Sequence, residues 1–352
     1  MYKINEIEKK NQRINPKKLE KIKNTFELDG LVVVEDLISS DLLDTINGKL
    51  NNDAAHIIYN HYQIHNKYPH HLQLGLPRDS NWVFPEIACN PIIEEILVEL
   101  LGGAVFMRYY NGNTSLPNGD FQKLHMDGGG WSIPNKLEAE KYDVDFPHPC
   151  FKLFVNIPTK NTNPENGSTE VWPGSHLITD IAEINDLQIE SKSVKSLIEK
   201  MKTGYPPRQI LTNKGSVIFR DLRLWHRGCP NFSNEPRHML SIGFGAEKDP
   251  FPNCSHLGSG KHRQVFSLDS KDKFTDTKFS PYVDKLLYFI DDQVDHFGNV
   301  APNSKYAQLN NSTGIVKSGP YANQSFDSRF KYSFFPQPLE GLKLKDLPKW
   351  CH

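Results

Sequence analysis

The stretch Phe121–Trp131 reads FQKLHMDGGGW, and the rest of the chain is best interpreted from it. It contains His125-Met126-Asp127, the only His-x-Asp or His-x-Glu triplet in the sequence. On an extended segment, side chains two residues apart point to the same side, so this imidazole and this carboxylate can bind one metal ion. Because the chain has 14 histidines, about one such triplet is expected by chance, and other segments must support the interpretation.

A second segment, Gly215–Phe244, supplies that support. Ser216–Phe219 is a short apolar, β-branched run after a glycine, which is typical of a strand. His226 lies just beyond it, and Arg237 follows eleven residues later at the start of a further strand-like run. A second histidine would complete the set of two imidazoles and one carboxylate that holds Fe(II) in non-haem oxygenases and leaves one face of the ion open. The alternative for His226 is an ordinary core histidine.

Arg237 has a separate predicted role. A buried, planar guanidinium is suited to a carboxylate, which it can bind through two parallel hydrogen bonds. A cosubstrate such as 2-oxoglutarate needs this partner at its far carboxylate while its keto-acid end chelates the iron. The alternative is a salt bridge between Arg237 and a buried aspartate.

Three motifs resemble the phytanoyl-CoA dioxygenase family of Fe(II)/2-oxoglutarate-dependent oxygenases. The first is QKLHMD at Gln122–Asp127, and the third is His226 with Arg237. The second, ENGSTEVWPGSH at Glu165–His176, is the most specific of the three. The resemblance covers roughly residues 20–250 and does not extend into the last hundred.

The resemblance implies a jelly-roll fold, Fe(II), 2-oxoglutarate and O2 as cofactors, and His125, Asp127 and His226 as the metal ligands. Further candidate cosubstrate contacts are Gln122, Asn156 and Trp172, although Trp172 is as well explained as a core residue. Related halogenases lack the carboxylate ligand so that halide can bind iron. The presence of Asp127 therefore favours hydroxylation, with desaturation or ring formation left open.

Composition argues against several classes of protein. The 41 basic and 42 acidic residues give no electrostatic reason to expect nucleic acid or a membrane surface as partner. The five cysteines have no paired spacing, which indicates free thiols in a reducing compartment. The chain has no apolar signal core at its start and no apolar run of membrane-spanning length, so we expect a cytoplasmic protein with a small-molecule substrate. A homo-oligomer is left open.

Short strand-like runs separated by Gly and Pro turns follow a more helical N-terminal part. This order predicts a mainly β fold with flanking helices (α+β), with a double-stranded β-helix, or jelly roll, at its core. The expected domains are a flexible segment 1–15, an oxygenase domain 16–250 and a C-terminal extension 251–352 packed on the same domain. The expected elements are helices at 17–28, 39–50, 90–101, 181–202 and 280–297, and strands at 31–34, 104–110, 151–157, 169–172, 216–219 and 239–244.

Two further segments have expected roles near the site. The run Trp131–Pro149 reads as a polar loop that could act as a lid. The His- and Tyr-rich run Asn51–Pro77 matches no metal-binding spacing, and we expect it on the surface or, in part, against the substrate pocket.

Two rival functions remain at this point. The first is a metal-dependent hydrolase or isomerase on the same barrel, for which Arg237 would be idle. The second is a catalytically inactive binding protein of the same fold. An intact set of ligands together with Arg237 argues against the second, and the substrate cannot be read from the sequence.

Overall fold

The computed structural model describes residues 1–61, 71–74, 81–127, 136–178, 199, 206–251, 265–267, 271–273 and 288–291. Its largest sheet has seven strands in the order β1-β2-β8-β5-β10-β4-β3, all antiparallel except the β1–β2 pair. The strands of this sheet are β1 (Tyr2–Lys3), β2 (Leu31–Glu35), β3 (His71–Leu74), β4 (Val105–Ser115), β5 (Lys152–Pro158), β8 (Val217–Asp221) and β10 (Arg237–Ala246).

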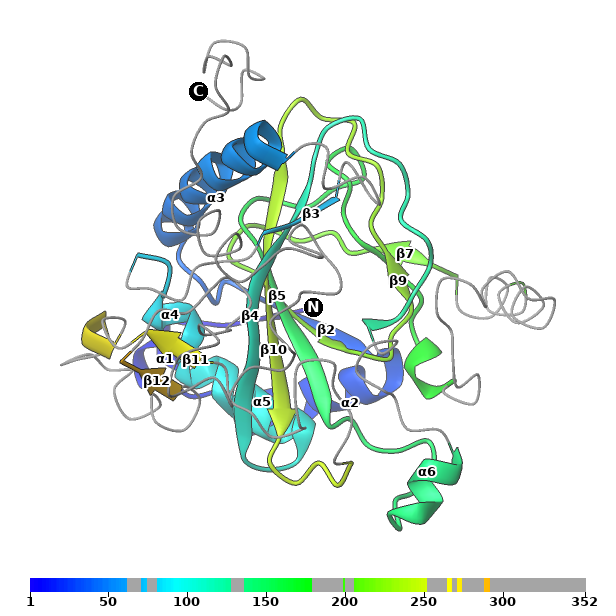
Figure 1. The fold of residues 1–352 in the computed structure, drawn as a ribbon. Coiled ribbons are helices and arrows are strands. Elements are labelled where there is room, and N and C mark those ends of the chain that lie inside the picture. Colours follow the sequence, from blue (N-terminus) through cyan, green and yellow to red (C-terminus); the bar gives the residue numbers. More distant parts are fainter. Residues whose placement is uncertain are drawn as a thin grey trace.

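A smaller, three-stranded sheet lies beside one end of the large one (Figure 1). Its order is β7 (Arg208–Gln209), β6 (Glu170–Val171) and β9 (His226–Arg227). The extended segment Gln122–Asp127 runs antiparallel along the free edge of β9, through a bridge between His125 and His226. The small sheet therefore brings the two predicted metal-binding segments together.

Helices cover one face of the large sheet. They are α1 (Glu6–Asn11), α2 (Pro16–Asp29), α3 (Ser40–His61), α4 (Pro85–Ala88) and α5 (Pro91–Leu101), with α6 (Lys136–Lys141) and the short 3-10 helix η2 (Ser175–Leu177) elsewhere. The start of α5 follows the sequence prediction, because the Asn90 side chain accepts hydrogen bonds from the backbone N–H groups of Ile92 and Ile93. No described helix is long and apolar enough to span a membrane.

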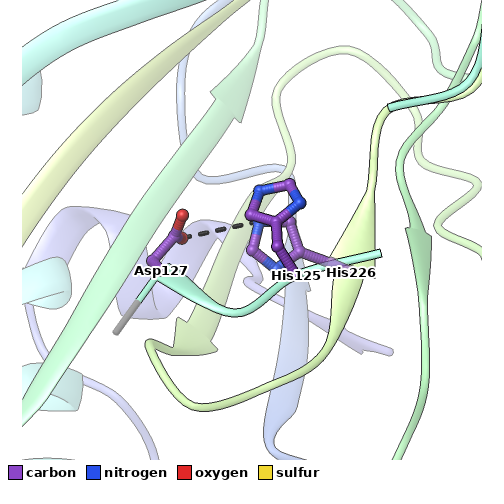
Figure 2. A group of neighbouring side chains, drawn as sticks. All are labelled: His125, Asp127 and His226. Carbon is purple, nitrogen blue, oxygen red and sulfur yellow. Dashed lines mark ion pairs between the residues drawn. The ribbon is translucent and has the colours of Figure 1, made fainter. Parts of the chain in front are cut away.

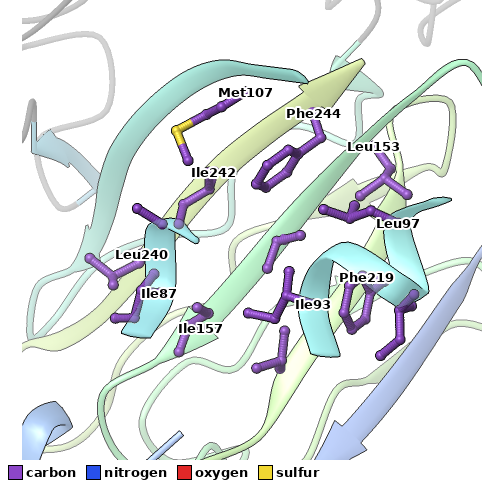
Figure 3. Close-up of a cluster of buried hydrophobic side chains, with 14 of the residues drawn as sticks. Ile87, Ile93, Leu97, Met107, Leu153, Ile157, Phe219, Leu240, Ile242 and Phe244 are labelled. Atoms are coloured by element: carbon purple, nitrogen blue, oxygen red, sulfur yellow. The ribbon is translucent and has the colours of Figure 1, made fainter. Parts of the chain in front are cut away.

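The main hydrophobic core lies between these helices and the large sheet. Figure 3 shows Ile93 and Leu97 of α5 packed on side chains from the strands. In β5, Leu153, Val155 and Ile157 face this core, as the alternating pattern predicts. Lys152, Phe154 and Asn156 therefore point to the opposite face. That second face of the sheet is the one directed at the predicted site.

The sheets and packed helices confirm the predicted α+β combination of sheets with flanking helices. The jelly-roll core itself stays a prediction, as do the domain boundaries. One strand and one helix are longer than expected: β4 continues past residue 110 to Ser115, and α3 continues past residue 50 to His61. The expected loop at 131–149 contains α6. The local composition is polar in each case, and polar composition alone does not separate a loop from a regular element; the added residues of β4 are in fact largely buried.

The expected flexible segment 1–15 instead forms β1 and α1. Ile4 and Ile14 are fully or almost fully buried in the main core. The Glu8 carboxylate accepts hydrogen bonds from the backbone N–H groups of Asn5 and Asn15, which closes a capping box at the start of α1. A Lys- and Asn-rich composition did not reveal these two isolated apolar anchors.

The expected helix at 280–297 is wrong at the residues that the structure describes there. Tyr288–Ile290 form β12, which pairs in parallel with β11 (Val265–Ser267). The run around it is short, apolar and aromatic, and such runs fit a strand as well as a helix. The expected helix at 181–202 lies outside the described residues except for Glu199, which is helical.

His238 next to Arg237 is a structural residue, as its position on the opposite face of β10 predicts. It is fully buried. One ring nitrogen, Nδ1, lies 2.6 Å from Thr114 Oγ1, and the other, Nε2, lies 2.7 Å from Asn51 Oδ1. Because the Asn51 oxygen only accepts, Nε2 donates and Nδ1 accepts from the threonine hydroxyl, so both bonds require the neutral ring. Burial lowers the pKa of His238 to about 3.

This pKa predicts a loss of stability in mild acid. An unfolded histidine has a pKa of about 6.5 and takes up its proton first as the pH falls, so the neutral buried ring destabilises the fold below that pH. Between pH 7.5 and pH 5, His238 alone should lower the free energy of unfolding by about 2 kcal/mol. Urea denaturation at both pH values, with wild type and His238→Gln, measures the effect. An equal drop in the two proteins would contradict it.

Candidate metal centre

The backbone fixes the two predicted metal-binding segments against each other. His125 N–H donates to His226 O at 3.0 Å, and His226 N–H donates to His125 O at 2.8 Å. Two residues further along, Asp127 N–H donates to Leu222 O at 3.0 Å. The two histidines therefore form a directly opposed antiparallel pair, and Asp127 lies beside the turn that leads from β8 into β9.

The three predicted ligands meet in space. One ligand atom from each of His125, Asp127 and His226 lies within 4.8 Å of the others, the only such group among the residues searched in the described part of the chain. Figure 2 shows the two imidazoles side by side, with the carboxylate opposite them. His226 Nε2 lies 3.5 Å from Asp127 Oδ2. Two imidazoles and one carboxylate in this arrangement suit Fe(II) and leave positions on the ion open.

Both imidazoles are oriented by a carbonyl two residues earlier in the chain. His125 Nδ1 lies 2.7 Å from Lys123 O, and His226 Nδ1 lies 2.9 Å from Leu224 O. Since a carbonyl only accepts, each Nδ1 carries the proton and each Nε2 presents its lone pair. This is the arrangement found around metal-binding histidines, where the second nitrogen donates to a carbonyl or carboxylate.

The charges of the site also suit a metal. Burial alone would raise the pKa of the Asp127 carboxyl, but the Arg220 guanidinium and the two imidazoles hold it well below its usual range. Burial and the Arg220 charge hold the pKa of His226 well below its usual value. At neutral pH the site therefore offers one carboxylate and a neutral imidazole on His226, the forms that bind a metal ion.

The turn between β8 and β9 is held by a buried ion pair. The Arg223 guanidinium donates to both carboxylate oxygens of Asp221, at 2.9 and 2.6 Å, and a further nitrogen donates to His148 O at 2.6 Å. The sequence left open whether this arginine contacts substrate. In the structure it is buried and fixes the turn that carries His226.

Arg237 is 4% exposed. Its Nη2 donates to Gly167 O at 2.7 Å, and its Nε to Asn166 O at 3.4 Å. No carboxylate within the described part of the chain forms an ion pair with it, so the alternative of a salt bridge to a buried aspartate finds no support there. Burial of the guanidinium lowers its pKa to about 10, so it keeps its positive charge at neutral pH.

The motif Glu165–His176 builds the walls around these groups. Gly167 has φ +70°, which favours glycine, and turns two carbonyls toward Arg237. Ser175 Oγ accepts from the Trp225 N–H at 2.8 Å, and Trp172 N–H donates to Trp225 O at 3.0 Å. The motif therefore holds the residue next to His226, and its family-specific pattern has a structural cause.

The other three residues predicted to contact the cosubstrate are Asn156, Gln122 and Trp172, and each has a defined position in the structure. Asn156 is buried, and its Nδ2 donates to Ser241 Oγ at 3.0 Å, on the face of the large sheet opposite the main core. The Gln122 Oε1 accepts from Gly228 N–H at 2.9 Å, which ties its segment to β9. Trp172 is buried, with its ring centroid 6.4 Å from that of Trp225. Their contact with a cosubstrate stays a prediction.

One residue in direct contact with the candidate ligands, Arg220, was not predicted from the sequence. From the sequence alone, this arginine could be either solvated or bound to substrate. In the structure it is 5% exposed and forms an ion pair with Asp127. The available signal was its place on a buried strand, where a charge needs a partner.

Comparison with known protein families supports the resemblance that the three motifs carry. The family model of phytanoyl-CoA dioxygenase (PhyH) matches residues 26–239, more than half of the chain. This chain belongs to the phytanoyl-CoA dioxygenase (PhyH) family of Fe(II)/2-oxoglutarate-dependent oxygenases. The resemblance carried by the three motifs is thereby confirmed.

Solved structures with a related fold are distant. AviO1 from Streptomyces viridochromogenes Tue57 is 16% identical, with 66% of this chain and 96% of that chain covered and a TM-score of 0.46. HygX from Streptomyces hygroscopicus, solved with nickel and 2-oxoglutarate, is 13% identical, with coverage of 67% and 88% and a TM-score of 0.45. EctD from S. alaskensis, solved with bound Fe, is 16% identical, with coverage of 66% and 77% and a TM-score of 0.44.

The geometry predicts which histidines bind a metal. His226→Ala and His125→Ala should each lose stoichiometric binding of Co(II), because each removes one of only three protein ligands. Isothermal titration of the metal-free proteins measures this. His238→Gln is the matched control, since that buried histidine lies on the other face of β10, and it should bind as wild type does. Wild-type affinity in either ligand variant would contradict the assignment.

Proposed function

We propose that this protein is an Fe(II)- and 2-oxoglutarate-dependent dioxygenase that hydroxylates an unactivated C–H bond of a small or medium-sized metabolite, with release of succinate and CO2. The observation that carries the proposal is the convergence of His125, Asp127 and His226 with protonation states ready for a metal. Membership of the family supports the class, and the choice of hydroxylation is ours.

Arg237 supports the cosubstrate. A buried guanidinium whose described acceptors are two backbone carbonyls keeps a full charge without a counter-ion. Such a charge is costly to bury unless an anion completes it. A dicarboxylate that bound the metal at one end could place its other carboxylate there, and 2-oxoglutarate has that chemistry.

When bound, Fe(II) with 2-oxoglutarate and dioxygen supplies the oxidant that removes hydrogen from the C–H bond and returns a hydroxyl group. The protein's own residues have simpler tasks. His125, Asp127 and His226 occupy one face of the ion and leave the other face to small molecules. Arg237 orients the cosubstrate by its far carboxylate.

An apolar wall next to the ligands keeps water away. Tyr109, Phe154 and Leu222 form a separate buried cluster, with the Tyr109 and Phe154 rings edge to face at 5.7 Å between centroids. Leu222 is also the residue whose carbonyl accepts from Asp127 N–H. Excluding water from a site strengthens its electrostatic contacts and protects a reactive oxidant from side reactions.

The proposed role of Arg237 predicts a spectroscopic result. Anaerobic protein loaded with Fe(II) should develop a weak visible charge-transfer band on titration with 2-oxoglutarate. Arg237→Met should weaken 2-oxoglutarate binding by about 2–5 kcal/mol, at least roughly thirtyfold, because it removes one partner of a buried charge pair. The metal affinity should stay unchanged, because the described hydrogen bonds of Arg237 go to the carbonyls of Asn166 and Gly167 and not to a ligand residue.

The exposed arginine Arg208, which pairs with Asp29, gives the control. Arg208→Met should show the wild-type band at the wild-type concentration of 2-oxoglutarate. If the wild type binds Fe(II) and never shows the band, the cosubstrate assignment fails and a non-oxidative hydrolase or isomerase becomes the better proposal. If Arg237→Met titrates like the wild type, the role of Arg237 fails alone.

Turnover separates an enzyme from an inactive binding protein. With Fe(II), O2 and 2-oxoglutarate, the wild type should form succinate slowly even without a substrate, and Asp127→Ala should abolish this formation because the set of ligands is incomplete. Succinate measured by mass spectrometry tests both statements. Full succinate formation by Asp127→Ala would refute the assignment of the carboxylate ligand, and a wild type without any succinate would favour the inactive protein.

A further inference from the structure

We propose that Arg220 is a positioning residue of the metal centre. It would hold the Asp127 carboxylate by an ion pair to Oδ2, and so fix the rotamer that brings this carboxylate to the two imidazoles. It would also tie the segment that carries Asp127 to the strand that leads to His226. This inference rests on the metal site of the proposed function but not on its cosubstrate.

The Arg220 guanidinium contacts the side chains of Asp127, Asn156, His226 and Phe154. Its Nη2 donates to Asp127 Oδ2. Its Nε donates to Asn156 Oδ1 at 3.4 Å, and its Nη1 lies 3.2 Å from His226 Nδ1. The guanidinium also lies over the Phe154 ring, 5.5 Å from its centroid. The side chain is therefore fixed by contacts within the protein.

The contact with His226 is one of packing. His226 Nδ1 already donates its proton to Leu224 O at 2.9 Å, so it has no lone pair left to accept from Arg220. Arg220 thus contacts two of the three candidate ligands, Asp127 through an ion pair and His226 through packing.

Arg220 and Arg237 differ in whether a carboxylate of the described chain already pairs with the guanidinium. The charge of Arg220 is already matched by Asp127, with side chains 6% and 23% exposed. Arg237 has only carbonyl partners in the described part of the chain. Arg237 is thus suited to an incoming carboxylate, and Arg220 to a carboxylate that belongs to the protein.

The segment Gln122–Asp127 needs this support because few bonds hold it. Its described backbone contacts with the small sheet and the turn are those of Gln122, His125 and Asp127. The Asp127 side chain is 23% exposed, so packing alone does not fix its rotamer. A planar guanidinium that comes from a rigid central strand supplies that constraint.

The test measures metal binding in the absence of 2-oxoglutarate. Arg220→Met should weaken Co(II) binding by about 10- to 100-fold, the usual effect of removing a residue that orients a ligand. Arg220→Lys keeps the charge but loses the planar donor geometry, so its Co(II) affinity should lie between those of the wild type and Arg220→Met. The visible spectrum of the Co(II) protein, which reports coordination, should change in Arg220→Met. Circular dichroism checks that the variants fold.

Arg227→Met is the matched control. Arg227 lies next to His226 in the chain, but its guanidinium pairs with Glu170 and lies over the Phe121 ring, 4.3 Å from the centroid. This variant also removes one positive charge near the site, so wild-type Co(II) affinity and spectrum are expected. A loss equal to that of Arg220→Met would show a general charge effect and would overturn the proposal.

A double-mutant cycle isolates the contact and works even if one variant is less stable. In Asp127→Asn, the neutral amide no longer forms an ion pair with Arg220, while its oxygen can still bind a metal. Adding Arg220→Met to Asp127→Asn should therefore cost less than twofold in Co(II) affinity. Equal costs in both backgrounds would overturn the proposal, as would an Arg220→Met protein that binds Co(II) as tightly as the wild type or more tightly.

The outcomes separate this inference from the proposed function. If the wild type binds no divalent metal, both fall. If the wild type binds Co(II) and Arg220→Met binds it equally well, only the role of Arg220 falls. If Arg220→Met binds Co(II) weakly while the wild type never shows the charge-transfer band with 2-oxoglutarate, only the cosubstrate assignment falls.

Discussion

The antiparallel backbone pair between His125 and His226 is the constraint on which the site depends. Two hydrogen bonds of 3.0 and 2.8 Å set these residues directly opposite each other. Directly opposed residues in an antiparallel pair project to the same face of a sheet. Two imidazoles from segments a hundred residues apart thereby meet at 4.4 Å between ring centroids. Much of the small sheet serves to hold this pair in place.

Three buried arginines lie around the site of the His125–His226 pair, and their charges have different partners. The Asp221–Arg223 pair holds the turn before His226, the Arg220–Asp127 pair holds the carboxylate, and Arg237 has only carbonyl partners among the described residues. Removing one partner of a buried pair leaves an uncompensated charge, so such pairs restrict the arrangement more than they stabilise the fold.

Much of the site follows from local features of the sequence. The spacing of His125 and Asp127, the strand before His226 and the distance to Arg237 identify the residues that the structure brings together or buries. The expected start of α5 holds because its cap, Asn90, acts on residues two and three positions away. The structure differs from the predictions for segments 1–15 and 280–297, because it depends there on contacts with distant residues and not on neighbours in the chain. Their structure depends on where Ile4 is buried and on which strand pairs with Tyr288–Ile290.

By itself, the sequence determined the family and the three residues, His125, Asp127 and His226, that the structure brings together as a candidate metal site. These depend on motifs, on residue chemistry and on the two-residue period of a strand. Only the tertiary structure decided the partners of the buried arginines. Arg220 and Arg223 lie on or next to the same buried strand, and the sequence does not distinguish their partners. The partners of Arg220, Arg223 and Arg237 are, in that order, Asp127, Asp221 and the carbonyls of Asn166 and Gly167. The charge that a buried guanidinium finds is set by strand order and register, and these place residues distant in sequence at hydrogen-bonding distance.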